Sequence, residues 1–122
     1  MNVTVKQDVK KYTEAEVRGI VLEARTEAHA AASTFFNTVL GGQDQFACGF
    51  AWVDIYKLRS NTKVAKVLQA EGIRKSYTGG LQLWNPAQFG CQNIDTLEAG
   101  ARAAADVFKR YGFEAYAGSR LD

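Results

Sequence analysis

The sequence has little of the residue types that build metal sites and disulfide scaffolds. Its 122 residues include one histidine, His29, and two cysteines, Cys48 and Cys91. One histidine excludes most histidine-based metal sites, and two cysteines are too few for a dense disulfide framework. Because the cysteines follow neither a CxxC nor a zinc spacing, we expect two ordinary thiols, with one reactive nucleophile as the alternative. We predict neither a metal nor another cofactor.

Long hydrophobic runs are also lacking. No stretch approaches the roughly 18 apolar residues that suggest a membrane span, and residues 1–16 contain no apolar core of signal-peptide length. Hydrophobic residues make up 47% and charged residues 23%, which are ordinary globular values. We therefore expect one soluble domain over residues 1–122, located in the cytoplasm, where thiols are usually reduced.

Catalytic motifs are lacking as well. The sequence contains no GxSxG, Walker or HExxH motif, and its glycines do not form GxGxxG after a predicted strand. Two of the 13 acidic residues could meet as a catalytic pair, but nothing in their spacing selects one. The prediction is a protein that is not an enzyme.

A long helix is predicted over residues 13–40, after an N-terminal arm or short edge strand at residues 1–12. Thr13 and Glu16 have the spacing of a capping box, apolar residues then recur every three or four positions, and Gly41-Gly42 ends the helix. Such a helix would be about 42 Å long, against a radius of gyration of about 14 Å for a domain of this size. Its alanine-rich middle predicts self-association into a homo-oligomer. The alternative is a break near residue 33.

Residues 46–117 predict an α+β body. In 46–56 both alternating faces are apolar except for Asp54, which predicts a central strand buried on both sides. Asp54 would then pair with an arginine or lysine, or open onto a cleft. A helix follows Ser60-Asn61-Thr62, and Gly79-Gly80 suits a two-residue hairpin loop between strands at 73–78 and 81–85.

The remaining elements complete a fold of order α-β-α-β-β-α-β. A second capping box at Asp95–Glu98 begins a helix that Gly112 ends, and residues 113–117 form a last strand. The buried stripe of this second capped helix should comprise Leu97, Ala101, Ala104, Phe108 and Tyr111. The expected fold class is α+β: a long N-terminal helix, then a roughly four-stranded, mainly antiparallel sheet with two further helices.

Positive charge gathers in the middle of the chain. The net charge is +2, but residues 57–94 hold six basic side chains and one acidic one, Glu71. Such a segment suits an anion such as a phosphate, a nucleotide or nucleic acid, and the alternative is a solvated helix face. Helix N-termini bind anions, amides read base edges and aromatic rings stack on bases. The predicted ligand-binding residues are Arg59, Asn61, Thr62, Lys63, Arg74, Trp84, Asn85, Phe89, Asn93 and Arg110. For Trp84 and Phe89 the alternative is a place in the core, and for the amides it is the capping of turns.

Three stretches, ACGFAWV (47–53), LQLWNP (81–86) and AYAGSRLD (115–122), resemble small bacteriophage proteins of unassigned function. The size, the long helix and the basic, amide-rich and aromatic middle are also similar to phage anti-defence proteins of the Thoeris-countering type. That family forms oligomers and sequesters cyclic ADP-ribose or cyclic dinucleotide signals without cleaving them. The resemblance implies a non-catalytic protein that sequesters a small nucleotide signal in the infected bacterial host.

Two alternatives stay open. One is a protein-interaction inhibitor of a host defence complex. The other is a single-strand nucleic-acid-binding module, for which a net charge of +2 is modest.

Overall fold

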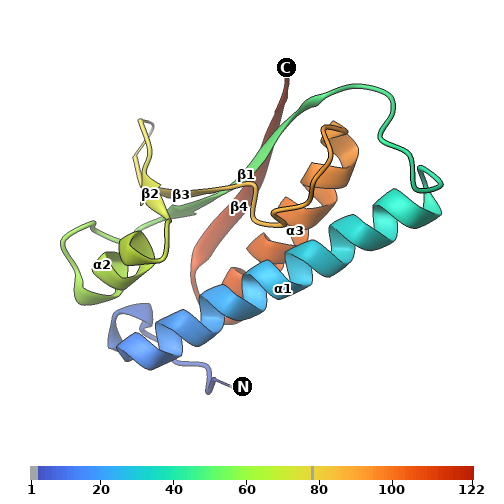
Figure 1. The fold of residues 1–122 in the computed structure, drawn as a ribbon. Helices are drawn as coiled ribbons and strands as arrows, with labels where there is room; N and C mark the ends of the chain where they lie inside the picture. The colour runs from blue at the N-terminus through green and yellow to red at the C-terminus, as the bar shows by residue number, and fades with distance from the viewer. Residues whose placement is uncertain (1–2, 78) are drawn as a thin grey trace.

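The computed structural model describes residues 3–77 and 79–122, and its fold is α+β as predicted (Figure 1). A long N-terminal helix precedes a four-stranded antiparallel sheet, and two shorter α-helices connect strands of that sheet. The elements in chain order are a short 3-10 helix (Val9–Lys11), α1 (Glu14–Thr38), β1 (Gly49–Tyr56), α2 (Lys63–Ala70), β2 (Arg74–Lys75), β3 (Leu81–Trp84), α3 (Ile94–Arg110) and β4 (Glu114–Leu121).

The sheet has the strand order β2-β3-β1-β4, and each neighbouring pair is antiparallel. At its centre, Val53 of β1 lies between Leu83 of β3 and Ala117 of β4. Helix α3 packs on β1 and β4, and α1 packs on α3 from the side away from the sheet (Figure 1). The core therefore lies on one face of the sheet.

Helix α1 is continuous, so the alternative of a break near residue 33 is wrong. Its predicted start is confirmed, because the Thr13 side chain accepts from the Glu16 N–H and the Glu16 carboxylate accepts from the Thr13 N–H. The described residues before it, from residue 3 on, form a 3-10 turn and irregular chain rather than an edge strand.

The alanine-rich middle of α1 has a partner inside the chain. A Cβ on Gly100 of α3 would lie 3.1 Å from the Ala28 carbonyl oxygen and 3.6 Å from the Ala32 Cβ, so the two helices approach very closely there. Self-association through α1 stays a prediction, and this alanine face is not available for it.

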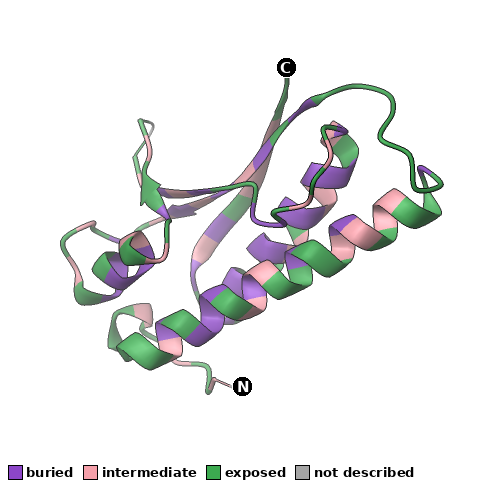
Figure 2. Cartoon of the chain, viewed as in Figure 1, coloured by how far each residue is buried: buried purple, intermediate pink, exposed green. Residues whose placement is uncertain are grey.

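The prediction that β1 is buried on both sides is wrong. Its residues alternate between buried and partly exposed, with Val53 and Ile55 fully buried and Phe50 39% exposed. The reason is that α1 and α3 both stack on the same side of the sheet, so the other side faces solvent (Figure 2).

Three further boundaries differ from the prediction. Lys75 is opposite Leu81, so the hairpin loop has five residues rather than two, although Gly79 and Gly80 do take positive φ angles. Helix α3 begins two residues earlier because Asn93, not Asp95, is its N-cap. Strand β4 continues to Leu121, since it stays paired with β1 as far as Gly49. Thr62, in contrast, caps α2 as the sequence suggested.

Within residues 3–77 and 79–122, no helix combines the length and the apolar character that crossing a membrane requires.

Candidate functional site

The face of the sheet that the helices leave uncovered carries most of the exposed aromatic side chains. In register, Trp52 of β1 lies between Trp84 of β3 and Gly118 of β4, and the next row is Gln82, Asp54 and Tyr116. We call this surface the open face; it comprises Phe50, Trp52, Asp54 and Tyr56 from β1, Gln82 and Trp84 from β3, and Tyr116, Gly118 and Arg120 from β4.

Trp52 is fixed in place on the open face. Its indole lies so close over Gly118 that a Cβ there would be 2.5 Å from Nε1. The same Nε1–H donates to Asp54 Oδ2 at 3.0 Å. Glycine at position 118 is therefore what lets the indole lie flat against the sheet.

Asp54 has partners other than those that the sequence suggested. Its Oδ1 accepts from Gln82 Nε2 at 3.0 Å and its Oδ2 from the Trp52 indole. Both partners are neutral donors, so the prediction of pairing with arginine or lysine is wrong. Asp54 orients its two neighbours, and both of its oxygens are already occupied.

A group of three aromatic rings and one arginine lies at one end of the open face, with the rings edge-on or tilted to one another, and we call it the stacking cluster: Phe50, Trp52, Trp84 and Arg120. The ring centroids of Trp52 and Trp84 are 5.1 Å apart, and those of Phe50 and Trp84 are 6.1 Å apart. The Arg120 guanidinium carbon lies 5.5 Å from the Phe50 centroid and 5.8 Å from that of Trp84. Trp84 remains 46% exposed, so an aromatic surface is presented to solvent.

A tyrosine pair lies at the other end of the open face. The rings of Tyr56 and Tyr116 are 6.0 Å apart, and Lys109 Nζ lies 5.7 Å from the Tyr116 centroid. The Tyr116 hydroxyl donates to Glu114 at 2.9 Å, and this bond is the main cause that raises the pKa of Tyr116. Four residues of strand, about 13 Å, separate Tyr56 from Trp52.

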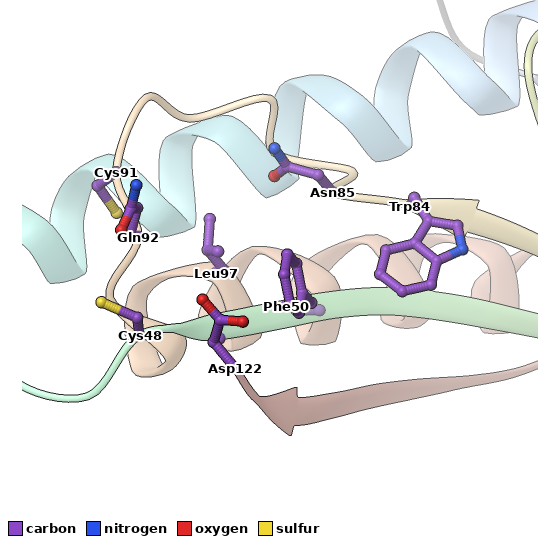
Figure 3. Close-up of a pocket in the computed structure, with 10 residues that line it drawn as sticks. Cys48, Phe50, Trp84, Asn85, Cys91, Gln92, Leu97 and Asp122 are labelled. Carbon is purple, nitrogen blue, oxygen red and sulfur yellow. The ribbon is translucent and has the colours of Figure 1, made fainter.

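A cavity of about 330 Å³ opens beside the stacking cluster. Figure 3 shows Phe50, Trp84 and Asn85 on one side of it, with Cys91 and Asp122 further along. Burial raises the pKa of the Cys91 thiol, which makes it a poor nucleophile at neutral pH. In the described part of the chain, no three His, Cys, Asp or Glu side chains come together as a metal site.

A second hollow, of about 450 Å³, lies on another side of Trp84 and is lined by two arginines. Strand β2 begins only at Arg74, which is opposite Gln82, so Leu83 and Trp84 at the end of β3 have no described strand beside them on this side. Arg74 and Arg25 line this gap. The Arg25 Nη2 donates to the Glu71 carbonyl at 2.6 Å, while its buried Nε has no hydrogen-bond partner among the described residues.

The ten predicted ligand-binding residues do not form one site. Trp84 lies in the stacking cluster, Asn85 lines the adjoining cavity and Arg74 lines the second hollow. Arg59 and Asn61 line a separate, open hollow between the β1–α2 loop and the hairpin.

The other predicted residues have structural partners. Thr62 is the α2 cap, and Lys63 lies on that helix beside Glu14. Phe89 packs against His29 and Phe36, with ring centroids 5.4 Å and 5.2 Å away.

Asn93 and Arg110 are used inside the fold. The Asn93 side chain is buried, accepts from both Thr96 donors and donates to the Gln45 carbonyl. Arg110 bridges α3 to α1 through Glu23 and Glu27 at 3.0 Å and 2.6 Å, and the hydrogen bond to Glu27 is the main cause that raises its pKa.

The sequence reasoning missed Phe50, Trp52, Tyr56 and Tyr116 as site residues because it assigned β1 to the core. A signal was present: only the stripes at 14–38 and 94–110 are long enough to cover a sheet, and α2 has eight residues. Two helices that pack on each other cover one face only.

The comparisons provide no relative from which a function can be transferred. No protein-family model matches this chain, and no curated protein or solved structure was found to be similar to it.

Proposed function

We propose that the protein is a non-catalytic binding module for single-stranded nucleic acid, and that the bases stack on the open face. The observation that supports this proposal is the exposed stacking cluster, in which Trp84 and Phe50 lie under the Arg120 guanidinium. Stacking of a base on an aromatic ring is worth about 1–3 kcal/mol and tolerates any base.

The layout of the open face suits more than one base. The stacking cluster and the tyrosine pair lie about 13 Å apart along β1, and Gln82 lies in the row between them. Arg120 lies within this surface, and further cations stand at its borders: Arg74 beside Trp84, and Lys109 beside Tyr116. A strand that crosses the face would therefore meet aromatic rings with its bases and basic groups with its phosphates.

The net charge of the protein sets how strongly the binding affinity should depend on salt. With a net charge of +2 and few cations around the face, few phosphates are neutralised, so the affinity should depend only moderately on salt. The carboxylates on the face are internally bonded, Asp54 to Trp52 and Gln82, and Glu114 to Tyr116.

The test is a titration of the protein with a fluorescently labelled single-stranded dodecamer, followed by anisotropy and by tryptophan emission. Trp52 and Trp84 are the two tryptophans of the chain and both lie on the open face, so stacking of bases should quench the intrinsic fluorescence. Trp84→Ala should weaken binding about 5- to 150-fold, which corresponds to the loss of one stack.

Leu22→Ala is the matched control, because Leu22 is also an exposed hydrophobic residue, at 66%, but lies on α1. Its affinity should equal that of the unchanged protein. Folded protein that binds no single strand at micromolar concentrations, or equal affinities for the Trp84 and Leu22 variants, would contradict the proposal.

A second candidate is sequestration of a small nucleotide signal of the cyclic ADP-ribose or cyclic dinucleotide class, as in an anti-defence protein of a phage. The cavity of about 330 Å³ favours it, because small-molecule sites begin at about 300 Å³. Trp84 would stack on a base and Asn85 would read its edge. Calorimetry with a panel of such nucleotides tests this function: saturable binding of one of them, without binding of the dodecamer, would favour it over the first.

A further inference from the structure

Strand β4 forms one edge of the sheet and is long for an edge strand. It has eight residues without proline and pairs with β1, while β2 at the opposite edge has two residues. No described strand lies along the outer side of β4. Long, unpaired edges of this kind are templates for pairing with another strand.

The hydrogen-bond pattern shows which backbone groups point outward. The Asp122 N–H donates to the Cys48 carbonyl at 3.0 Å, so this residue points toward β1. Since alternate residues of a strand point to opposite sides, the outward groups belong to Ala115, Ala117, Ser119 and Leu121. These four residues offer N–H and C=O groups to a fifth strand.

We propose that the occupant of this edge is a second copy of the same chain, whose β4 pairs antiparallel about a two-fold axis at Ala117. In this register, Glu114 lies opposite the partner's Arg120, and this pair occurs twice because of the symmetry. Tyr116 lies opposite the partner's Gly118, and therefore beside the partner's Trp52 indole, which covers that glycine. Toward the helices the pairs are small: Ala117 with the partner's Ala117, and Ala115 with the partner's Ser119.

Charge selects this register over the next one. Residues that are directly opposite must share a face of the sheet, so the register can move only in steps that keep even residues opposite even residues. The next step toward the C-terminus would place Glu114 opposite the partner's Asp122, which is a repulsive pair. The step in the other direction places Arg120 opposite the partner's Gly112, before its β4 begins, so Arg120 loses its carboxylate partner.

The charged side chains of β4 have bonding capacity left for this arrangement, although Glu114 already pairs with Lys57 and Tyr116 of its own chain. Glu114 Oε2 is buried and accepts no hydrogen bond from the described residues, and Lys57 Nζ lies 3.5 Å from it. Arg120 is exposed and pairs with no described carboxylate. Only Lys109 of α3 reaches across to Tyr116, and as an exposed, flexible side chain it can swing away.

Pairing of this kind would join the two four-stranded sheets into one of eight strands (Figure 1 shows β4 at the border of the sheet). The two open faces would then form one continuous surface. This inference concerns assembly and stands independently of the proposed function.

Sedimentation velocity over a range of protein concentrations tests the pairing. The unchanged protein should form a dimer, and Glu114→Arg and Arg120→Glu should each reduce dimerisation at least tenfold, because like charges then meet twice. Mixing the two variants should restore a dimer. One chain then has arginine at both 114 and 120 and the other has glutamate at both, so each of the two contacts joins opposite charges. Residues 114 and 120 lie about 20 Å apart along one strand, so a contact inside one chain cannot produce this rescue.

Ala117→Pro, which removes an outward N–H but no bond to β1, should abolish the dimer, with circular dichroism as the check on folding. A protein that is monomeric at all concentrations overturns the proposal. A dimer that persists in these variants also overturns the proposal. If that dimer is lost when Leu22 is substituted, the chains associate through α1 instead. Failure of the mixed variants to associate overturns the register.

Discussion

The two faces of the central sheet are built from different side chains. On the covered face, Val53 and Ile55 are fully buried, in a core that also holds Phe108 of α3. On the open face, the same strand carries Phe50 and Trp52, and Trp84 stands beside them. Large aromatic rings that stay in water contribute less to folding than buried ones, and this is why the cluster supports the proposed binding role.

The open face also differs from the covered face in how its rings are held. The Trp52 indole packs directly on Gly118 and donates a hydrogen bond to Asp54, whereas Trp84 keeps nearly half of its surface exposed. One ring therefore serves as a fixed support and the other as the accessible platform. A core needs no such division, because every side chain in it is held by its neighbours.

The largest expected effect separates the two faces by stability. Phe108 of α3 is fully buried on the covered side, so Phe108→Ala should lower the free energy of unfolding by about 3–5 kcal/mol. Trp84→Ala removes a half-exposed ring and should cost about 1 kcal/mol, the value of an aromatic pair. Urea denaturation of both variants measures the difference.

Equal losses for the two variants would break the comparison. A loss of 3 kcal/mol or more for Trp84→Ala, in the range of a core residue, would mean that the open face belongs to the core. The proposed binding role would then lose its main support.

A medium effect is expected for Gly118→Ala. The new Cβ would lie 2.5 Å from Trp52 Nε1, so the indole must tilt and its bond to Asp54 must lengthen. Overpacking of this kind costs about 1–3 kcal/mol, and the tryptophan emission should shift as the ring leaves the sheet. Gly90→Ala is the control, because a Cβ there meets no atom within 4 Å.

Local signals in the sequence predicted most of the fold. The capping box at Thr13, the cap at Thr62 and the stop at Gly112 each depend on a few neighbouring residues, and all three are confirmed. The predicted capping box at Asp95–Glu98 is wrong, because Asn93 is the N-cap of α3. The Asn93 side chain is buried and also donates a hydrogen bond to the Gln45 carbonyl, a contact with a distant segment that the local sequence does not reveal.

The candidate site could be predicted only in part, because it depends on contacts between distant segments. Trp84 and Arg74 carry a local signal as an aromatic and a basic residue beside a turn. The exposure of Phe50 and Trp52 instead depends on where α1 and α3 pack, and the alternating apolar pattern of 46–56 also suits a fully buried strand. The surroundings of Phe89 and Arg110 could not be predicted for the same reason, because their partners lie on α1.

The smallest expected effect compares one tyrosine on each side of the molecule. Tyr111, which is 7% exposed, donates to Glu23 at 2.8 Å, and this bond is the main cause that raises the pKa of its phenol. Tyr116, which is 48% exposed, donates to Glu114 on the open face. Tyr111→Phe should cost about 1 kcal/mol, the net value of a sheltered hydrogen bond, and Tyr116→Phe should cost little, because water replaces its bond.

The pH dependence of this effect has a definite sign. Because folding raises the pKa of Tyr111, its contribution is fully present below pH 10 or so and is lost as the pH rises further, when the unfolded chain ionises first. The difference in melting temperature between the unchanged protein and Tyr111→Phe should therefore be constant from pH 7 to about 9 and shrink above about 10. A difference that grows with pH would contradict the raised pKa of Tyr111. An equal cost for Tyr116→Phe would show that the two sides shelter their phenol–carboxylate bonds alike, and that the open face is less accessible to water than its geometry indicates.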